Sequence, residues 1–161
     1  MSESLDRTVL VAATVASGLL AGLFYAYSVS VMRGLARTAD RTFVESMRQI
    51  NVAILNGWFA LGFAGAPVLT ALALVVHLDG ADPATAAWIS LALVSAFITL
   101  AVTLTVNVPL NDELASVEER DAGVARGRFE GRWVRWNLAR TISSTTAFGC
   151  LVLALASNGA G

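Results

Sequence analysis

The chain contains no lysine, one cysteine and one histidine in 161 residues. Cys150 therefore has no partner for a disulfide within the chain. A lone histidine, His77, cannot supply a histidine-rich metal or haem site. Phosphate-binding and dinucleotide-binding glycine motifs are also missing, so the sequence predicts neither a cofactor nor a metal. Charged residues make up only 14% and the net charge is −1, so no nucleic-acid partner is expected.

Apolar residues, by contrast, are abundant and are gathered into four long blocks. They make up 56% of the chain, and the mean hydropathy is +0.66. Each block is long enough for a transmembrane helix, which needs ~20 residues. The first block is also longer than the apolar core of a cleavable signal peptide. The sequence therefore predicts an all-α, polytopic four-helix membrane protein, one domain over residues 1–161, with helices at about 8–32, 50–78, 84–109 and 133–157.

The arginines are distributed unevenly between the ends of these helices. They are concentrated in and beside the connections 33–49 and 110–132, whereas the segments 79–84 and 157–161 have none. Because successive helices alternate in direction, the two arginine-rich connections share one face, which the positive-inside rule makes cytoplasmic. We therefore expect a bacterial cytoplasmic (inner) membrane protein with both termini outside and both arginine-rich loops in the cytoplasm.

Both inner connections are predicted to have structure of their own. Phe43 and Met47 recur at helical spacing after Asp40, a candidate N-cap, which indicates an amphipathic helix at the membrane interface. The connection 110–132 is highly charged, which is typical of a solvated helical hairpin or lid.

The expected partners are the lipid bilayer, a lipophilic small molecule and a second copy of the chain. The homo-oligomer is suggested by Gly18 and Gly22, whose GxxxG spacing favours close packing of helices. That packing fits contacts within one bundle as well as contacts between two protomers.

Polar side chains gather at the cytoplasmic ends of all four predicted helices. Such groups are costly in lipid and tend to face the interior of a bundle. Their distribution predicts a polar pocket open to the inner leaflet. The candidate catalytic residues are Arg140, Asn137 and Asp112, and the candidate substrate-binding residues are Tyr25, Ser28, Asn51, Asn56, Asn107, Asn111, Trp133, Trp136 and Ser144.

Arg140 is the most unusual of these residues, because it lies well inside the fourth apolar block. Trp133, Asn137 and Arg140 recur at intervals of three and four and share one stripe of that helix. An unpaired arginine there costs at least ~2.5–3.5 kcal/mol. Arg140 therefore either snorkels to the headgroups or faces the pocket beside a partner. The candidate carboxylate partners are Glu45, Asp112 and Glu130.

Four segments carry a recognisable combination of residues: FYAYSVSVM (24–32), INVAILN (50–56), NVPLND (107–112) and RFEGRWVRWNLART (128–141). This combination resembles the anthrone-oxygenase-like family of small four-helix membrane proteins from bacteria and fungi, long catalogued as a domain of unknown function. The resemblance covers about residues 8–157. A few fungal relatives are associated with oxidising anthrones to anthraquinones during pigment synthesis. The resemblance implies that the motif positions line the functional pocket: Asn107, Asn111, Trp133, Trp136, Asn137 and Arg140.

The first functional hypothesis is a cofactor-independent oxygenase or oxidase acting on a lipophilic aromatic of the anthrone type. An anthrone has an acidic C–H group, and its carbanion passes an electron to O₂ unaided. Such an enzyme needs a base, donors that hold the oxyanion, and rings that stack on the substrate. The candidates are Asp112 or Glu130 for the base, Arg140, Asn107 and Asn137 for the donors, and Tyr25 and Trp136 for the rings.

Three other interpretations of the sequence stay open. The pocket fits a non-enzymatic protein that binds a lipid or quinone, or an accessory subunit of a membrane complex, because inner-leaflet arginines suit anionic headgroups. A small transporter is a second alternative, although four helices without broken-helix repeats are few for that task. In the third, the polar stripe only holds the helices together.

Overall fold

The structure is a computed structural model that describes residues 3–77 and 82–158. Every regular element within these ranges is helical, and four rods are long and apolar enough to cross a membrane. The predicted all-α four-helix membrane bundle is therefore confirmed. The elements are α1 (Glu3–Ala26), η1 (Tyr27–Val31), α2 (Met32–Leu35), α3 (Asp40–Ala53), α4 (Gly57–His77), α5 (Pro83–Val102), η2 (Thr103–Asn107), α6 (Val108–Ala115), η3 (Glu119–Asp121) and α7 (Ala122–Asn158).

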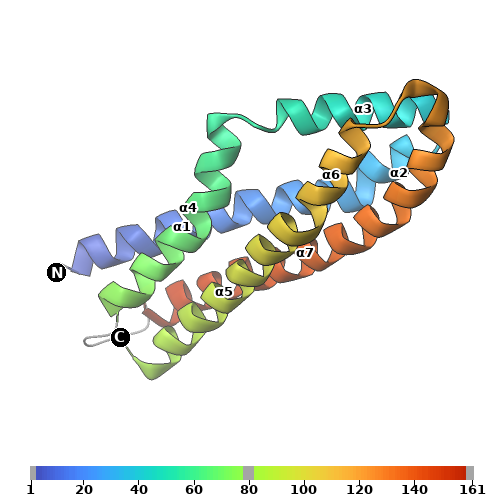
Figure 1. Cartoon of the computed structure of the whole chain (residues 1–161). Helices are drawn as coiled ribbons and strands as arrows, with labels where there is room; N and C mark the ends of the chain where they lie inside the picture. Colours follow the sequence, from blue (N-terminus) through green and yellow to red (C-terminus); the bar gives the residue numbers. More distant parts are fainter. Residues whose placement is uncertain (1–2, 78–81, 159–161) are drawn as a thin grey trace.

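Two of the four rods contain a single π-helical turn. The first rod joins α1, η1 and α2, and the third joins α5, η2 and α6 (Figure 1). Pro109 lies in the first turn of α6, close behind the second π-turn. A proline has no N–H to donate, but at this position the π-turn accommodates it and the rod continues to Ala115. The third rod thus runs beyond the expected end near residue 109.

The other two rods also differ in length from the sequence expectation. The second begins at Gly57, because the chain bends at 54–56 between α3 and α4. Asn56 stabilises this bend, since its Oδ1 accepts a hydrogen bond from the backbone N–H of Phe59 at 3.0 Å. The fourth, α7, is a single helix of 37 residues that begins at Ala122. Much of the expected connection 110–132 is therefore helix that extends the third and fourth rods.

Small residues allow the helices to pack closely in the membrane-spanning part. The core there contains Ala13, Ala73, Ala92 and Ala154, all with no exposed surface. At Gly18 a Cβ atom would lie 3.0 Å from the ring of Phe148, so the glycine gives this ring room where α1 meets α7. Gly22 is exposed and has no atom within 4 Å of an added Cβ. The GxxxG pattern is thus used within the chain at its first glycine.

The outer surface of the rods is apolar, as a bilayer requires. Leu19 is 70% exposed, Val68 is 64% exposed and Ile142 is 60% exposed. No other part of the described chain covers these side chains, so lipid is their natural environment.

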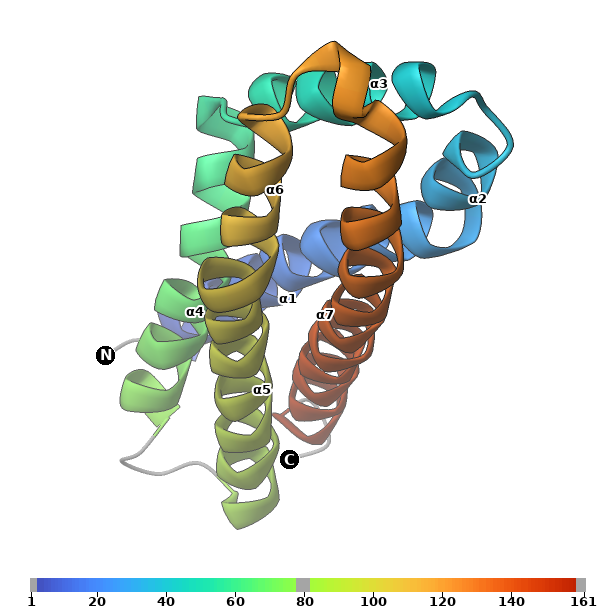
Figure 2. The same cartoon turned by 45° about the vertical axis from the view of Figure 1, so that its right-hand side comes forward.

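Helix α3 lies across one end of the bundle together with the turn between α6 and α7, and both termini lie toward the other end (Figures 1 and 2). The apolar side of α3 is anchored by Phe43 and Met47, which are fully buried, as the helical spacing predicted. Asp40 is the first residue of α3 but does not cap it. Its carboxylate instead accepts a hydrogen bond from Arg126 at 2.9 Å.

Two arginines fasten α3 at its two ends. Arg126, on α7, donates to the carbonyl oxygens of Ala36 and Thr38, each at 2.8 Å, so it satisfies free carbonyls at the end of α2. Arg48, in the second half of α3, donates to the carbonyls of Leu114 and Val117 at and beyond the end of α6. These bonds hold α3 over the ends of α6 and α7.

Candidate functional site

A cavity of about 420 Å³ lies beneath α3, at the arginine-rich end of the bundle. Its volume is in the range of ligand sites, which measure roughly 300–1,000 Å³. It is walled by the first rod, the α3–α4 bend, the second π-turn, α6 and α7. The lining residues are Phe24, Tyr27, Arg48, Asn51, Val52, Ile54, Leu55, Phe59, Thr103, Asn107, Val108, Asn111, Asp112, Ala115, Trp133 and Arg140.

Arg140 faces this cavity and does not snorkel to the surface. It is only 6% exposed. Its guanidinium carbon lies 4.4 Å from the ring centre of Phe24 and 5.2 Å from that of Trp133. One of its terminal nitrogens donates to Oδ1 of Asn137 at 2.8 Å. Two cation–π contacts and one amide therefore hold the charge.

Arg140 has no carboxylate partner in the described part of the chain, contrary to the sequence expectation. Glu130 is occupied by Arg126, whose Nε lies 2.7 Å from its Oε2. Glu45 accepts a hydrogen bond from Gln49 at 3.0 Å. Asp112 lines the same cavity, at its exposed side, but forms no salt bridge with Arg140. A buried cation without a counter-charge attracts an anion into the cavity.

Several other polar atoms on the cavity wall also lack partners among the described residues. Asn107 is 1% exposed, and neither its Oδ1 nor its Nδ2 has a hydrogen bond. The Nδ2 atom of Asn51 and the Nε atom of Arg140 are likewise buried without a partner. These atoms each expose less than 1 Å², so they lie behind the accessible wall of the cavity. Buried polar groups in folded proteins are almost always paired, so this polar layer around Arg140 is unusual.

The two π-turns place residues at this cavity. Tyr27 lies in the first, and Thr103 and Asn107 lie in the second. A π-turn inserts one extra residue into a helix and shifts the phase of the residues after it, and such turns are frequent at functional sites. Here the second turn leaves Thr103 and Asn107 both buried.

Aromatic rings form the rest of the buried wall. Trp133 is 3% exposed, its ring centre lies 5.5 Å from that of Tyr27, and its Nε1 donates to Oδ1 of Asn111 at 2.9 Å. Phe59 lines the cavity from α4, next to the bend. The combination of flat apolar rings and a few polar groups suits an aromatic ligand.

Asn137 lies behind Arg140 and is outside the cavity lining. Its Nδ2 donates to the carbonyl of Phe24 at 3.1 Å and to Oγ of Ser28 at 2.9 Å. It therefore joins α7 to the first rod while its oxygen holds Arg140. Ser144 also lies behind the site, because its hydroxyl donates to the backbone carbonyl of Arg140 at 2.7 Å.

Three of the sequence candidates point away from the cavity. Tyr25 is 58% exposed and Trp136 is 40% exposed, so neither ring faces the site. Asn56 is exposed and supports the α3–α4 bend. The sequence candidates that do line the cavity are Arg140, Asp112, Asn51, Asn107, Asn111 and Trp133.

Comparison with known families gives one match: the anthrone oxygenase family model matches residues 56–150. The match covers more than half of the chain and includes both the second π-turn and the stripe that carries Arg140. The chain belongs to the anthrone oxygenase family. Comparison with curated proteins and with solved structures gave no significant match.

The cavity of this family member extends beyond the matched segment. Phe24, Tyr27, Arg48 and Asn51 line it and precede residue 56. Phe24, Tyr27, Arg48, Phe59 and Thr103 also line the cavity but are not among the site residues predicted from the sequence. Phe24 and Phe59 are apolar residues in apolar blocks, so nothing in the sequence distinguishes them from lipid-facing positions.

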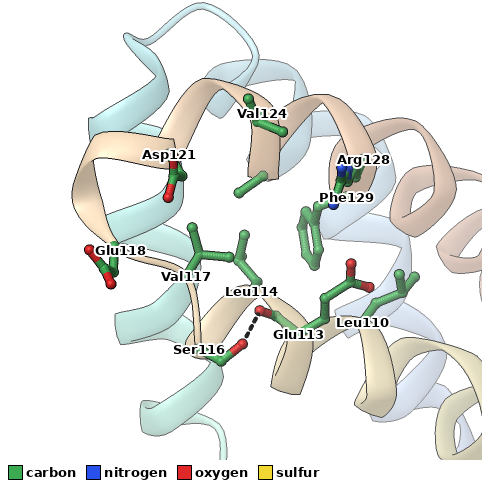
Figure 3. A pocket seen from close by; sticks show the side chains of 11 residues that line it. Leu110, Glu113, Leu114, Ser116, Val117, Glu118, Asp121, Val124, Arg128 and Phe129 are labelled. Carbon is green, nitrogen blue, oxygen red and sulfur yellow. Dashed lines mark hydrogen bonds between the residues drawn. The ribbon is translucent and has the colours of Figure 1, made fainter.

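The anthrone oxygenase family member also has a second cavity, of about 350 Å³, on the opposite face of α6 (Figure 3). Leu114, Val117 and Phe129 form its apolar side, and Glu113, Glu118 and Arg128 are among its polar residues. It shares no lining residue with the Arg140 cavity. No group of three or more His, Cys, Asp or Glu side chains in residues 3–77 and 82–158 is arranged to hold a metal ion.

Proposed function

We propose that this protein is a cofactor-independent oxygenase that oxidises a lipophilic, anthrone-type aromatic in the Arg140 cavity. The observation that carries the proposal is the buried Arg140, which has no carboxylate partner among the described residues and lies against two aromatic rings. A guanidinium in this setting stabilises an enolate oxygen, because its charge acts at close range in a site that excludes water. Membership of the anthrone oxygenase family supports the same reaction class.

The reaction begins with removal of a proton from the acidic C–H of the substrate. Asp112 is the only carboxylate in the described lining of this cavity, so it is the proposed base. The electron pair left on carbon delocalises onto the carbonyl oxygen, and this enolate is the species that Arg140 holds. Asn107 and Asn51 belong to the lining of the same cavity.

The carbanion then reduces O₂, which is the second substrate. Transfer of one electron gives a carbon radical and superoxide, which combine to form a C–O bond and, after protonation, a hydroperoxide. Loss of the remaining C–H proton and cleavage of the O–O bond release water and leave a carbonyl. The sum is one CH₂ group plus O₂ giving one C=O plus H₂O, so no external reductant is needed.

The substrate is proposed to enter from the inner leaflet of a bacterial cytoplasmic membrane, with both termini outside. Val52 and Leu55 line the cavity and are 69% and 80% exposed, and Trp58 beside them is 86% exposed. This apolar corner at the α3–α4 bend suits direct transfer of a lipophilic molecule from the bilayer. The proposal includes a homo-oligomer in which a second copy packs against α1 at the exposed Gly22.

The experiment is to follow oxygen uptake and quinone absorbance with anthrone and the protein purified in mild detergent. We expect uptake above a boiled-protein control, insensitive to chelators, and lost in Arg140→Met. Arg132→Met is the matched control, because Arg132 is an exposed arginine on the same helix. Uptake at background in all samples, with the protein folded, contradicts the oxygenase proposal.

Binding of a lipid or quinone without turnover is the second candidate function. The same unpaired Arg140 favours it, since an anionic headgroup or a quinone oxygen satisfies the guanidinium equally well. Native mass spectrometry of the purified protein distinguishes it, because a retained lipid or quinone would appear as a defined added mass.

A further inference from the structure

A further, much smaller cavity lies deeper in the bundle, between α1, α4, α5 and α7, and is called the inner cavity below. It measures about 10 Å³, close to the ~10–15 Å³ that one molecule of the size of water needs. One alanine from each of α4, α5 and α7 lines it, which is why space remains between the helices. The wall includes Leu20, Phe63, Ala66, Ala96, Leu100 and Ala147.

The inner cavity lies one helical turn below the Arg140 cavity on all four rods. On each rod, a residue that lines the inner cavity is four positions from a residue that lines the Arg140 cavity. The pairs, with the inner residue first, are Leu20 and Phe24, Phe63 and Phe59, Thr99 and Thr103, and Ser144 and Arg140. Four residues of a helix rise ~6 Å. The two cavities therefore follow one another along the axis of the bundle.

The wall of the inner cavity offers little to a water molecule. The Thr99 hydroxyl is paired with the Ser143 hydroxyl at 2.7 Å, and the Ser144 hydroxyl donates to the carbonyl of Arg140 at 2.7 Å. Ser17 Oγ has no hydrogen-bond partner among the described residues, but it exposes less than 1 Å² and does not reach the open space. A buried water needs about two to four polar partners, whereas apolar cavities stay dry and take up apolar guests.

A small cluster of apolar side chains separates the two cavities. Phe24, Leu20 and Ala66 form its buried part, and Phe59 and Phe63 pack against it. The upper side of this partition is the Phe24 ring, over which the Arg140 guanidinium lies at 4.4 Å. Whatever occupies the inner cavity is thus one ring away from the place where Arg140 is proposed to hold the enolate.

The second substrate of the proposed reaction fits this position. A bound aromatic fills the Arg140 cavity from the α3–α4 bend, so O₂ needs a way that does not pass it. O₂ is a small apolar gas and dissolves better in the hydrocarbon of the bilayer than in water. We propose that the inner cavity binds O₂ from the bilayer and delivers it past Phe24 to the substrate carbanion. The use of this O₂ rests on the proposed function, but its binding does not.

Binding is measured with O₂ itself, because its two unpaired electrons speed the nuclear relaxation of methyl groups beside it. The protein carries isotope-labelled alanine methyl groups in lipid nanodiscs and is compared under nitrogen and under O₂, without substrate. Each of three helices supplies an alanine of the inner cavity and a fully buried control: Ala66 and Ala73 on α4, Ala96 and Ala92 on α5, Ala147 and Ala154 on α7. The increase in relaxation is expected to be several-fold larger at the cavity alanine of each pair.

Ala147→Val tests whether this O₂ reaches the reaction. The larger side chain fills the space, so the relaxation increase at Ala66 and Ala96 should fall to the level of the controls. With anthrone as substrate, KM for O₂ should rise several-fold while KM for anthrone is unchanged, because the Arg140 cavity is intact. Ala139→Val is the matched control, since Ala139 lies on the same helix and lines neither cavity. Ala96→Val, made in parallel, decides the case if Ala147→Val does not fold.

The outcomes separate this inference from the oxygenase proposal. Equal relaxation increases at cavity and control alanines overturn the O₂ site. An unchanged KM for O₂ in a folded Ala147→Val protein, with the relaxation increase lost, overturns the delivery of O₂ from this site. If the cavity alanines respond to O₂ but no sample consumes it with anthrone, the O₂ site stands and the oxidation fails. If oxygen uptake occurs without any response at these alanines, the oxidation stands and the site fails.

Discussion

The guanidinium of Arg140 donates to the side-chain oxygen of Asn137, one turn earlier on α7, at 2.8 Å. The nitrogen of the same amide donates to the first rod, at the carbonyl of Phe24 and the hydroxyl of Ser28. One neutral side chain therefore positions the cation and ties it to the opposite helix without cancelling its charge. A carboxylate at this position would pair with Arg140 more strongly, but it would remove the attraction for an anionic ligand.

Asn137→Asp tests whether the missing counter-charge serves binding. The new carboxylate is expected to form an ion pair with Arg140 and to weaken binding of an anionic aromatic about tenfold or more, since that pair must be broken or screened by the ligand. Titration of the variant with 1,8-dihydroxyanthrone, at a pH where the probe is ionised, measures the loss. Unchanged affinity would show that the charge of Arg140 is not what the ligand uses.

Asn137→Ala is the companion variant and separates positioning from charge. It removes the bonds to Phe24 and Ser28 as well as the bond to Arg140, so the free energy of unfolding should fall by about 1–3 kcal/mol. Thermal unfolding in detergent gives the difference. A loss of ligand affinity much smaller than that of the aspartate variant would assign the aspartate effect to charge.

Arg140→Lys tests the shape of the cation. Lysine keeps the charge but lacks the planar fork that stacks over Phe24 and Trp133. We expect kcat/KM for anthrone oxidation to fall, though less than in Arg140→Met, where loss of the oxyanion donor should cost about 10²–10³-fold. Oxygen-electrode kinetics measure both variants. Equal activity of the lysine variant and the wild type would mean that only charge matters at this position.

Asp112→Asn tests the proposed base. The amide cannot accept the substrate proton, so kcat should fall by about 10²–10⁴-fold, as oxygen-electrode kinetics would show. Glu113→Gln is the matched control, because Glu113 is the next residue but lines the cavity on the other face of α6. If Asp112→Asn keeps its activity, the substrate enters already ionised or another group removes the proton.

Hydropathy predicted the four spans, because it is a property of long segments of sequence. The inward stripe of α7 was also predictable, since Trp133, Asn137 and Arg140 follow helical spacing in an unbroken helix. The side of the first rod that faces the cavity was not predictable from the sequence. Tyr25 is the sequence candidate for a ring that stacks on the substrate, yet Phe24 and Tyr27 line the cavity. Phe24 and Tyr25 both lie in α1 before the π-turn, so the turn does not decide which of the two rings faces inward. Packing of α1 against α4 and α7 decides it.

The partner of Arg140 was unpredictable for a different reason. A buried arginine is expected to need a partner, and Glu130 is a candidate carboxylate on the same helix. That carboxylate is used by Arg126, which fastens the end of α2 and the start of α3 to α7. Which of Arg126 and Arg140 pairs with Glu130 depends on the position of α3. The helical periodicity of α7 gives no information about that position.

Arg126→Ala tests the fastening of α3. Its side chain makes hydrogen bonds to Ala36, Thr38, Asp40 and Glu130, so its loss should lower the free energy of unfolding by about 2–3 kcal/mol. Limited proteolysis should then cut faster in the α2–α3 turn. Arg132→Ala removes the same charge from an exposed position of the same helix and should leave both measurements unchanged.

Leu55→Trp tests the proposed route from the bilayer. Leu55 lines the cavity and is 80% exposed at the α3–α4 bend, so a larger side chain narrows the mouth without touching Arg140. We expect a higher KM for anthrone in lipid nanodiscs with kcat little changed, because access to the cavity is hindered and the reacting groups are intact. Leu61→Trp adds the same ring at a position of α4 that is 68% exposed and outside the cavity lining. Equal KM values for the two variants would place the opening of the cavity elsewhere, on the side where Asp112 is exposed. The substrate would then enter from the cytoplasm.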